Sequence, residues 1–128
     1  MRFMMLVIPK GYEKAAADFV PPADLVAKMD KYNESLAKAG VVLGLDGLHP
    51  PAGGARVRFA GGNAKVTDGP FTEAKEVLGG YWMIQVKSKA EAIEWAKRAP
   101  MQDGDIIEVR QVWELSDFPP DFQKAAGR

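Results

Sequence analysis

The sequence predicts an α+β fold in which two helices cover one face of a single β-sheet. Three observations predict it: a first strand that is apolar on both faces, two segments with helical spacing of apolar residues, and short strands before and after each of them. The length of 128 residues suits one domain, 1–128, with its own core. Hydrophobic residues make up 47% and charged residues 27%, as in an ordinary globular domain.

The first part of the chain predicts a strand, a helix and a second strand. Residues 2–8 are apolar in both alternating sets, so we expect this strand to be covered on both faces. Residues 10–20 are expected to form a loop. Apolar residues at steps of three and four predict a helix at about 23–39, which Gly40 can end. This stripe consists of Leu25, Met29, Tyr32, Leu36 and Ala39. Residues 41–45 follow as a strand.

A β-hairpin insertion is expected near 55–67. Two alternating segments there flank Gly61-Gly62-Asn63, which is a typical hairpin turn sequence. Residues 78–87 then contain the strongest strand signal, with Trp82 and Tyr81 on opposite faces. The adjacent glycines Gly79 and Gly80 indicate a bulge or a close backbone approach.

The last part of the chain predicts a helix, a strand and a tail. Ser88 can cap a helix that runs to about Ala99, with Glu91 at the capping-box position. A final strand is expected over 105–115, with Ile107, Val109, Trp113 and Leu115 on one face. The short tail, 116–128, is expected to hold one or two helical turns.

This order of elements predicts a ferredoxin-like α+β sheet with both helices on one face. The strands at 2–8 and 81–86 nevertheless carry bulky apolar side chains on both faces. Because a large exposed apolar face is unusual in a monomer, the second face needs a cover. The simplest cover is a second copy of the same sheet, related by a two-fold axis. We therefore expect a homodimer with a cleft near the sheet-to-sheet interface.

Charge and composition exclude several classes of function. Lys+Arg and Asp+Glu are 17 each, so no basic surplus indicates a nucleic-acid partner. The absence of cysteine excludes disulfides, thiolate catalysis and iron–sulfur clusters. The apolar run at 3–8 is too short to span a membrane and lacks a signal-peptide cleavage site. We expect no membrane partner and a cytoplasmic location.

The connector between the hairpin and the strongest strand reads Asp68-Gly69-Pro70-Phe71-Thr72-Glu73-Ala74-Lys75-Glu76, with Leu78-Gly79-Gly80-Tyr81 after it. It resembles the signature of the DGPF branch of the YCII-related family. The resemblance extends over about residues 2–113, and Gln111 departs from it, where the family usually has proline. Further blocks that resemble the family are Gly40-Val41-Val42, Gly47-Leu48-His49-Pro50, Val66-Thr67, Glu91-Ala92-Ile93-Glu94-Trp95-Ala96 with Pro100, and Ile107-Glu108-Val109-Arg110.

The resemblance implies a ferredoxin-like subunit that dimerises as an α/β barrel, and it implies no established activity for this branch. Some relatives are linked to small-molecule chemistry such as dehydrochlorination, through a histidine on the first helix and an aspartate. Here that helix position falls near Met29, and no histidine occurs between residues 1 and 48, so the pair does not carry over. DGPF-type proteins are also often encoded beside, or fused to, regulators such as extracytoplasmic-function sigma factors.

Candidate site residues lie in the charged connector and in two neighbouring segments. Asp68 near a dimer cleft can act as a general base if burial raises its pKa, or can simply form the turn before Gly-Pro. Glu73 and Lys75 can bind a polar ligand or form a solvated salt-linked surface. His49, the one histidine, lies in a proline-rich loop, where it can act as a base or be merely exposed. Arg58 can hold an anion.

Three hypotheses of function follow from these residues. The first is a homodimer that binds a small polar molecule and transfers protons without a cofactor, as a lyase or isomerase. In this hypothesis Asp68 or His49 is the base, and Arg58 or Lys75 holds the anionic group of the ligand. The alternative is a non-enzymatic regulatory or partner-binding module. The third is a haem or metal protein, which would depend on His49 with a carboxylate such as Asp46 or Asp68, and no known ligand spacing supports it. We expect no cofactor.

Overall fold

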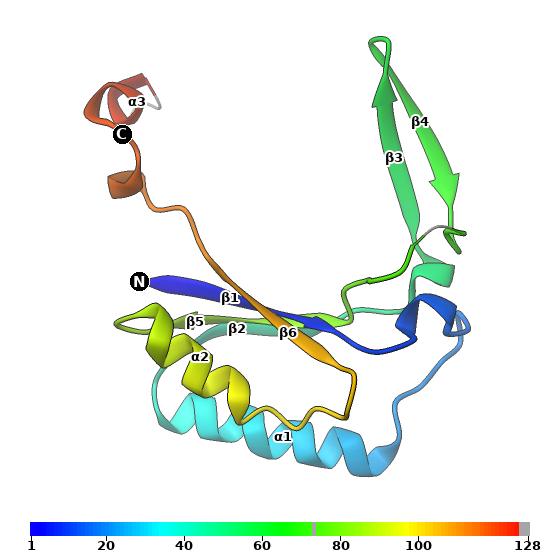
Figure 1. The fold of residues 1–128 in the computed structure, drawn as a ribbon, viewed down its shortest axis with the longest axis horizontal. Coiled ribbons are helices and arrows are strands. Elements are labelled where there is room, and N and C mark those ends of the chain that lie inside the picture. The colour runs from blue at the N-terminus through cyan, green and yellow to red at the C-terminus, as the bar shows by residue number, and fades with distance from the viewer. Residues whose placement is uncertain (73, 126–128) are drawn as a thin grey trace.

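The computed structural model describes residues 1–72 and 74–125 and shows a mixed α+β architecture (Figure 1). Its four-stranded sheet has the order β2-β5-β1-β6, and every neighbouring pair is antiparallel. This order is consistent with the predicted ferredoxin-like α+β fold. The sheet strands are β1 (Arg2–Ile8), β2 (Val42–Gly47), β5 (Gly80–Gln85) and β6 (Ile106–Gln111). The other main elements are α1 (Ala23–Lys38), α2 (Lys89–Lys97), α3 (Pro120–Ala125) and a separate hairpin of β3 (Ala55–Ala60) and β4 (Asn63–Asp68).

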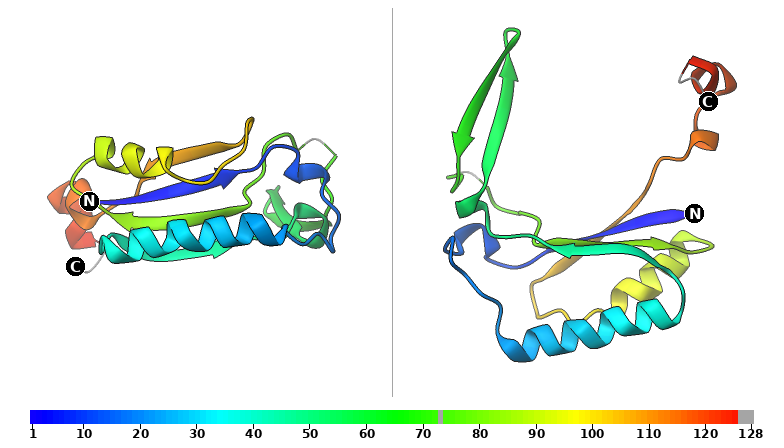
Figure 2. Two further views of the ribbon diagram at one scale, coloured as in Figure 1. Left: turned by 90° about the horizontal axis from the view of Figure 1, so that it is seen from below. Right: turned by 180° about the vertical axis from the view of Figure 1, so that it is seen from behind.

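Helices α1 and α2 lie on the same face of the sheet, and the core fills the space between the two layers (Figures 1 and 2). Alternation along β1 and β5 turns one set of side chains toward the helices, as the sequence predicted. The buried hydrophobic residues of this layer are Phe3, Met5, Val7, Trp82, Ile84, Val86, Tyr32, Leu36 and Ala92. The helical stripe predicted for 23–39 is confirmed at Tyr32 and Leu36, whereas Ala39 is exposed.

The cap predicted for the second helix is confirmed. Ser88 Oγ accepts a hydrogen bond from the backbone N–H of Glu91 at 3.2 Å. The Glu91 carboxylate in turn accepts one from the backbone N–H of Lys87 at 3.0 Å. These two bonds satisfy donors that would otherwise be unpaired at the start of α2.

The opposite face of the sheet carries no helix within the described part of the chain. Met4, Leu6, Ile8, Tyr81 and Met83 point to this side and are half-buried. The strand register brings Met4 opposite both Met83 and Arg110, and Leu6 opposite both Tyr81 and Glu108. The apolar centre of this face, predicted from the first strand, therefore exists and is rimmed by charge. We refer to it as the open face.

The β-hairpin predicted near 55–67 is confirmed and projects away from the body of the molecule (Figure 1). Its turn residues Gly61 and Gly62 have φ values of 59° and 79°. Positive φ at both central residues is the backbone of a type I′ turn, which suits the twist of a two-stranded ribbon. The sequence before it, Pro51–Gly53, forms a short 3₁₀ turn.

Two local predictions were wrong. The final strand ends at Gln111 instead of 115, because β1 begins at Arg2 and the bond from Val112 N–H to the Arg2 carbonyl is the last that β1 can accept. Trp113 therefore leaves the sheet and is 69% exposed. The second strand, predicted at 41–45, also runs on to Gly47, because Asp46 and Gly47 still pair with Tyr81 and Gly80 of β5.

Candidate functional site

The residues predicted from the charged connector do not converge on a cavity. Asp68 ends β4 and is exposed, and Lys75, Arg58 and His49 are exposed as well. Within the described residues, no hydrogen bond or ion pair joins any two of these four side chains. Glu73 lies outside the described residues. Arg58 projects from the hairpin opposite Lys65, so two cations face each other across the strands.

The DGPF segment instead fixes the hairpin to the body. The Gly69 N–H donates to the Gly54 carbonyl at 2.9 Å, and a Cβ on Gly69 would collide with the Pro51 carbonyl oxygen. The Arg56 guanidinium lies 4.0 Å from the centre of the half-buried Phe71 ring. Gly69 and Phe71 therefore act in the structure as the shape-determining residues of this connector.

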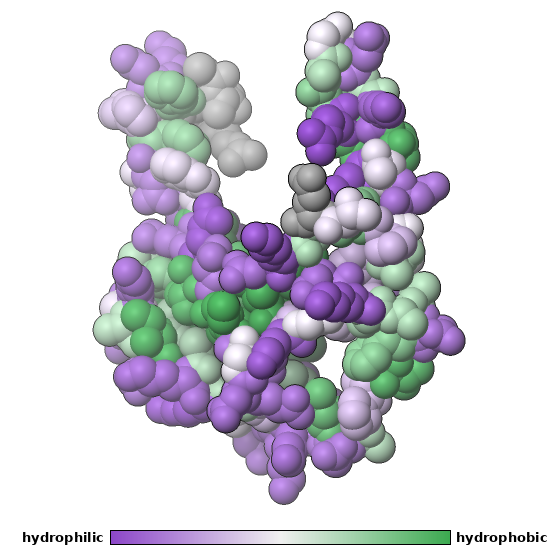
Figure 3. All heavy atoms as spheres, turned by 45° about the vertical axis from the view of Figure 1, so that its right-hand side comes forward, coloured by the Kyte–Doolittle hydropathy of each residue, from purple (hydrophilic) through white to green (hydrophobic). Residues whose placement is uncertain are grey.

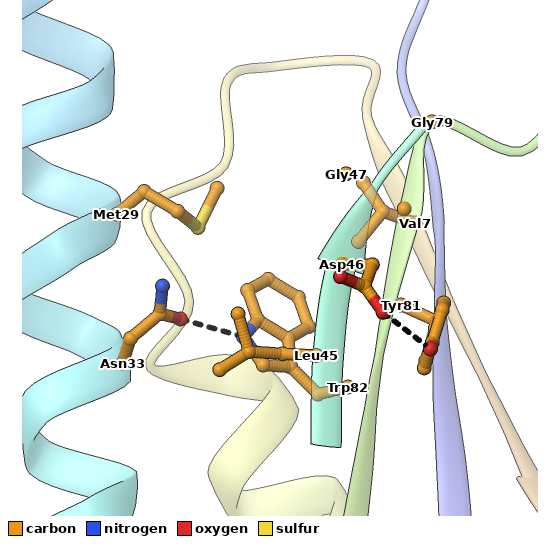
Figure 4. A pocket seen from close by; sticks show the side chains of 10 residues that line it. Val7, Met29, Asn33, Leu45, Asp46, Gly47, Gly79, Tyr81 and Trp82 are labelled. Carbon is orange, nitrogen blue, oxygen red and sulfur yellow. Dashed lines mark hydrogen bonds between the residues drawn. The ribbon is translucent and has the colours of Figure 1, made fainter. Parts of the chain in front are cut away.

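A cavity of about 150 Å³ lies between α1 and the strands β2 and β5 (Figure 4). Met29 and Asn33 line it from α1, and Leu45 and Trp82 line it from the strands. The Trp82 indole Nε1–H donates to Asn33 Oδ1 at 2.7 Å, which fixes the amide with its NH₂ group as a remaining donor. This bond crosses from helix to sheet and sets the width of the cavity.

A second cavity of about 290 Å³ adjoins the first and shares Val7, Met29, Gly47 and Gly79 with it. Its walls are largely apolar, and two carboxylates, Asp30 and Asp105, lie among its lining residues. The other lining residues are Pro9, Tyr12, Phe19, Pro21, Leu25, Val26, Pro100 and Met101. Concave sites with mostly apolar walls and a few polar groups are typical of small-molecule binding.

Asp46 and Tyr81 form a hydrogen-bonded pair at the margin of the smaller cavity. The Tyr81 hydroxyl donates to the Asp46 carboxylate at 2.7 Å. Figure 4 shows this pair on the side of β2 away from Asn33, which is the open face of the sheet. The bond to Asp46 raises the pKa of Tyr81, and the nearby negative charge acts in the same direction. The phenol is therefore kept protonated as a donor at neutral pH.

A β-bulge places Asp46 on this face. Val42 lies opposite the core residue Ile84, but Gly44 lies opposite Met83 on the open face, so the register of β2 shifts between them. Without the shift, strict alternation would turn Asp46 to the same side as Val42. The sequence analysis named Asp46 only as a possible metal ligand, because the bulge cannot be seen from alternation, although Gly44 is the kind of residue that marks one.

Gly80 lets β2 and β5 approach closely beside the pair. A Cβ on Gly80 would lie 2.8 Å from the Asp46 carbonyl oxygen, and one on Gly79 would lie 2.5 Å from the Pro9 ring. Either contact is too short for a real side chain, so the close backbone approach predicted for these two glycines is confirmed. Gly80 thus lets the strand carrying Tyr81 lie against the strand carrying Asp46, whereas Gly79 lets the chain before β5 lie against Pro9.

Two charged residues on the open face pair with each other. The Arg110 guanidinium lies 3.4 Å from the Glu108 carboxylate, and both side chains are exposed. Their cross-strand neighbours are Met4 and Leu6. The pair is therefore a surface ion pair between two residues of the same strand, at the charged rim of the open face.

Two searches of the described residues bear on other classes of site. Across residues 1–72 and 74–125, no three histidine or carboxylate side chains lie close enough together to share a metal ion. No helix in the same part of the chain is long and apolar enough to cross a membrane.

Comparison with known proteins identifies the family. The family model described as the YCII-related domain matches residues 1–116. An uncharacterised protein of Rhizobium meliloti (strain 1021) is 39% identical over 74 residues, which cover 58% of this chain and 56% of that protein. The match thus spans little more than half the length of the relative. Since the family model covers nearly the whole chain, including every strand of the sheet, the protein belongs to the YCII-related family.

Proposed function

We propose that this protein is a homodimer that binds a small polar molecule beside Asp46 and Tyr81 and transfers a proton without a cofactor, as a lyase or isomerase. One observation carries the proposal: a carboxylate and a phenol, whose bonded oxygens are 2.7 Å apart, lie on the open face, and their residues also line the cavity on the other side of the strands. The connector Asp68–Glu76 supports placement in the DGPF branch of the family.

The two groups have complementary abilities. Asp46 keeps acceptor capacity after bonding to Tyr81, because a carboxylate has about four lone-pair sites. It can therefore take a proton from a ligand carbon or hydroxyl. Tyr81 has one O–H hydrogen and donates it to Asp46, so it holds the carboxylate in place and leaves only acceptor capacity for a ligand.

A second subunit on the open face would complete this site. Met4, Leu6, Ile8 and Met83 form a half-buried apolar surface around the pair, and a second sheet packed there would form the dimeric α/β barrel. Such a cover would exclude water from Asp46.

The proposal is tested first by ligand binding. A thermal-shift screen with small hydroxy acids, keto acids and lactones should find compounds that raise the melting temperature of the wild-type protein. Asp46→Asn should reduce that increase, because a neutral amide replaces a charged hydrogen-bond acceptor, and it should abolish proton transfer, because the amide cannot act as a base. Compounds that bind are then incubated in D₂O, and NMR should show deuterium entering the ligand with the wild-type protein only.

Asp68→Asn is the matched control, because Asp68 is exposed and lines neither cavity described above. The proposed site beside Asp46 would be supported if Asp68→Asn keeps both ligand binding and deuterium exchange into the ligand while Asp46→Asn weakens the binding and loses the exchange. Loss in Asp68→Asn alone, or in a His49→Gln variant alone, would move the base to the connector or the loop as the sequence analysis predicted. Deuterium exchange that survives all three substitutions would refute the assignment of the base.

The alternative function, a non-enzymatic module that docks another macromolecule, is favoured by one observation. Exposed apolar side chains occur on the hairpin and after β6, including Phe59 at 79% and Trp113 at 69% exposure. If these surfaces stay exposed in the dimer, they offer an area for a partner. A dimer in which they are covered would remove the support for this alternative.

A further inference from the structure

Two projections rise from the open-face side of the sheet, one near each end of it (Figures 1 and 2). One is the β3–β4 hairpin. The other, which we name the C-terminal arm, consists of residues 112–125 after β6. Figure 3 shows open space between them and apolar residues among polar ones on both. The two projections therefore flank the surface on which the proposed second subunit would lie.

The hairpin has one apolar side. Val57 lies directly opposite Val66, and Phe59 is two residues along the same side. Their exposures are 52%, 64% and 79%. An isolated two-stranded ribbon is marginally stable in water, and this one is paired to no other strand of the described chain. Its apolar side therefore lacks the cover that a stable hairpin needs.

The C-terminal arm carries a row of three aromatic rings. The ring centres of Trp113 and Phe118 are 4.8 Å apart, and those of Phe118 and Phe122 are 6.2 Å apart, both in stacked orientation. Trp113 is 69% exposed and Phe122 63%. The base of the arm is held by Glu114, which accepts two hydrogen bonds from the Arg2 guanidinium at 2.6 and 3.1 Å. The arm thus presents a preformed apolar surface.

The two projections have opposite charge. The hairpin, residues 55–68, holds three cations (Arg56, Arg58, Lys65) and one carboxylate (Asp68), a net charge of +2. The C-terminal arm holds three carboxylates (Glu114, Asp117, Asp121) and one cation (Lys124), a net charge of −2. Arg56, Arg58 and Lys65 alternate to the side of the hairpin away from Val57 and Phe59. The opposite net charges therefore favour the approach of hairpin and arm as whole projections and do not act within the apolar contact.

We propose that, in the homodimer, the apolar side of each hairpin packs on the aromatic row of the partner's C-terminal arm. This inference depends on the proposed dimer. A two-fold axis that lies parallel to the sheet and across its strands reverses the strand direction, and so brings the hairpin of one copy to the end where the other copy has its arm. The contact then occurs twice in the dimer. The hairpin of the first subunit packs on the arm of the second, and the hairpin of the second packs on the arm of the first.

The absence of cysteine makes a clean cross-linking test possible. Phe59→Cys and Phe122→Cys chains with different affinity tags are co-expressed, and the doubly tagged dimer is purified and treated with oxidant or a short bis-maleimide. Separate chains rule out a link within one chain. The expected product is a covalent heterodimer, with little covalent dimer from either variant alone.

Each of the other possible results of the cross-linking experiment would contradict one part of the proposal. A covalent dimer from Phe59→Cys alone would show that hairpin meets hairpin, contrary to the proposal. A dimer by light scattering that gives no hairpin-to-arm product with either reagent would refute the arm contact and leave the dimer intact. A monomer by light scattering would refute both this inference and the dimer that it depends on.

A binding measurement adds a quantitative check. Phe59→Ser and Phe122→Ser should each raise the dimer dissociation constant about tenfold or more, the effect of losing one buried aromatic contact. Val26→Ser is the matched control, because Val26 is 43% exposed on α1, away from both projections. Equal effects from all three substitutions would contradict the proposed contact.

Discussion

Tyr32 makes two kinds of interaction in the core. Its ring meets Trp82 edge to face at a centroid distance of 5.1 Å, and its hydroxyl donates to the Trp95 carbonyl at 2.6 Å. Only 6% of the residue is exposed, so its single polar atom is satisfied where water is excluded. Burial raises the pKa of Tyr32 to about 12. One residue thus links α1, the sheet and α2.

The raised pKa of Tyr32 predicts that the folded protein loses stability at alkaline pH. Because its folded-state pKa lies above the unfolded value near 10, folding favours the neutral phenol. That contribution is fully present below about pH 10 and is lost as pH rises toward about 12. Tyr32→Phe should lower the free energy of unfolding at pH 7 by about 1 kcal/mol, the worth of one hydrogen bond. It should also flatten the alkaline decline measured by urea unfolding.

Tyr12→Phe is the control for this experiment. Burial also raises the pKa of Tyr12, but its hydroxyl reaches the exposed Leu48 carbonyl. We expect a smaller change in the alkaline decline for Tyr12→Phe than for Tyr32→Phe. An unchanged decline in Tyr32→Phe would show that this phenol does not dominate the high-pH behaviour.

At the scale of elements, local patterns predicted the fold well where each element carries its own signal. The first strand, the helix capped by Ser88 and the hairpin turn at Gly61-Gly62 are all confirmed. The end of β6 was not predictable, because it depends on where a strand distant in sequence begins. The Asp46–Tyr81 pair was not predictable for the same reason, since the meeting of these two residues depends on a register shift between strands.

The hairpin turn makes a prediction at this scale. Gly61→Ala or Gly62→Ala forces a side chain into the left-handed region at a cost of roughly 1 kcal/mol. Because the hairpin lies apart from the core, we expect faster hydrogen exchange at residues 55–68 and little change in overall unfolding. Gly53→Ala serves as the control, since Gly53 has open space around its Cβ position and no positive φ. Unchanged exchange in both turn variants would contradict the role assigned to the turn.

At the scale of the whole molecule, the open face is an apolar surface that no helix of the described chain covers. Its apolar centre was predicted from strand 2–8 alone, since residues there are apolar in both alternating sets. What covers that face was not predictable from local patterns, because a partner leaves no periodicity in the sequence. The proposed dimer and the arm contact both concern this surface.

Met4→Asp is the corresponding test of the open face. Met4 lies opposite Met83 and Arg110 near the centre of that face, so a buried carboxylate there should prevent dimerisation without removing core packing. Light scattering should report a monomer, and the melting temperature should no longer rise with protein concentration. Val26→Asp, on α1, should remain dimeric. A wild-type melting temperature that is independent of concentration would count against the dimer.

The central position of β1 also determines when the sheet can be completed during synthesis. β1 leaves the ribosome before the other strands of its sheet, yet its two partners are β5 and β6, at residues 80–85 and 106–111. Its methionine-rich segment therefore stays unpaired along both edges while most of the chain is made. Such a segment is a natural target for chaperones, and a chain that stops before residue 106 is expected to aggregate more readily than one that reaches Gln111.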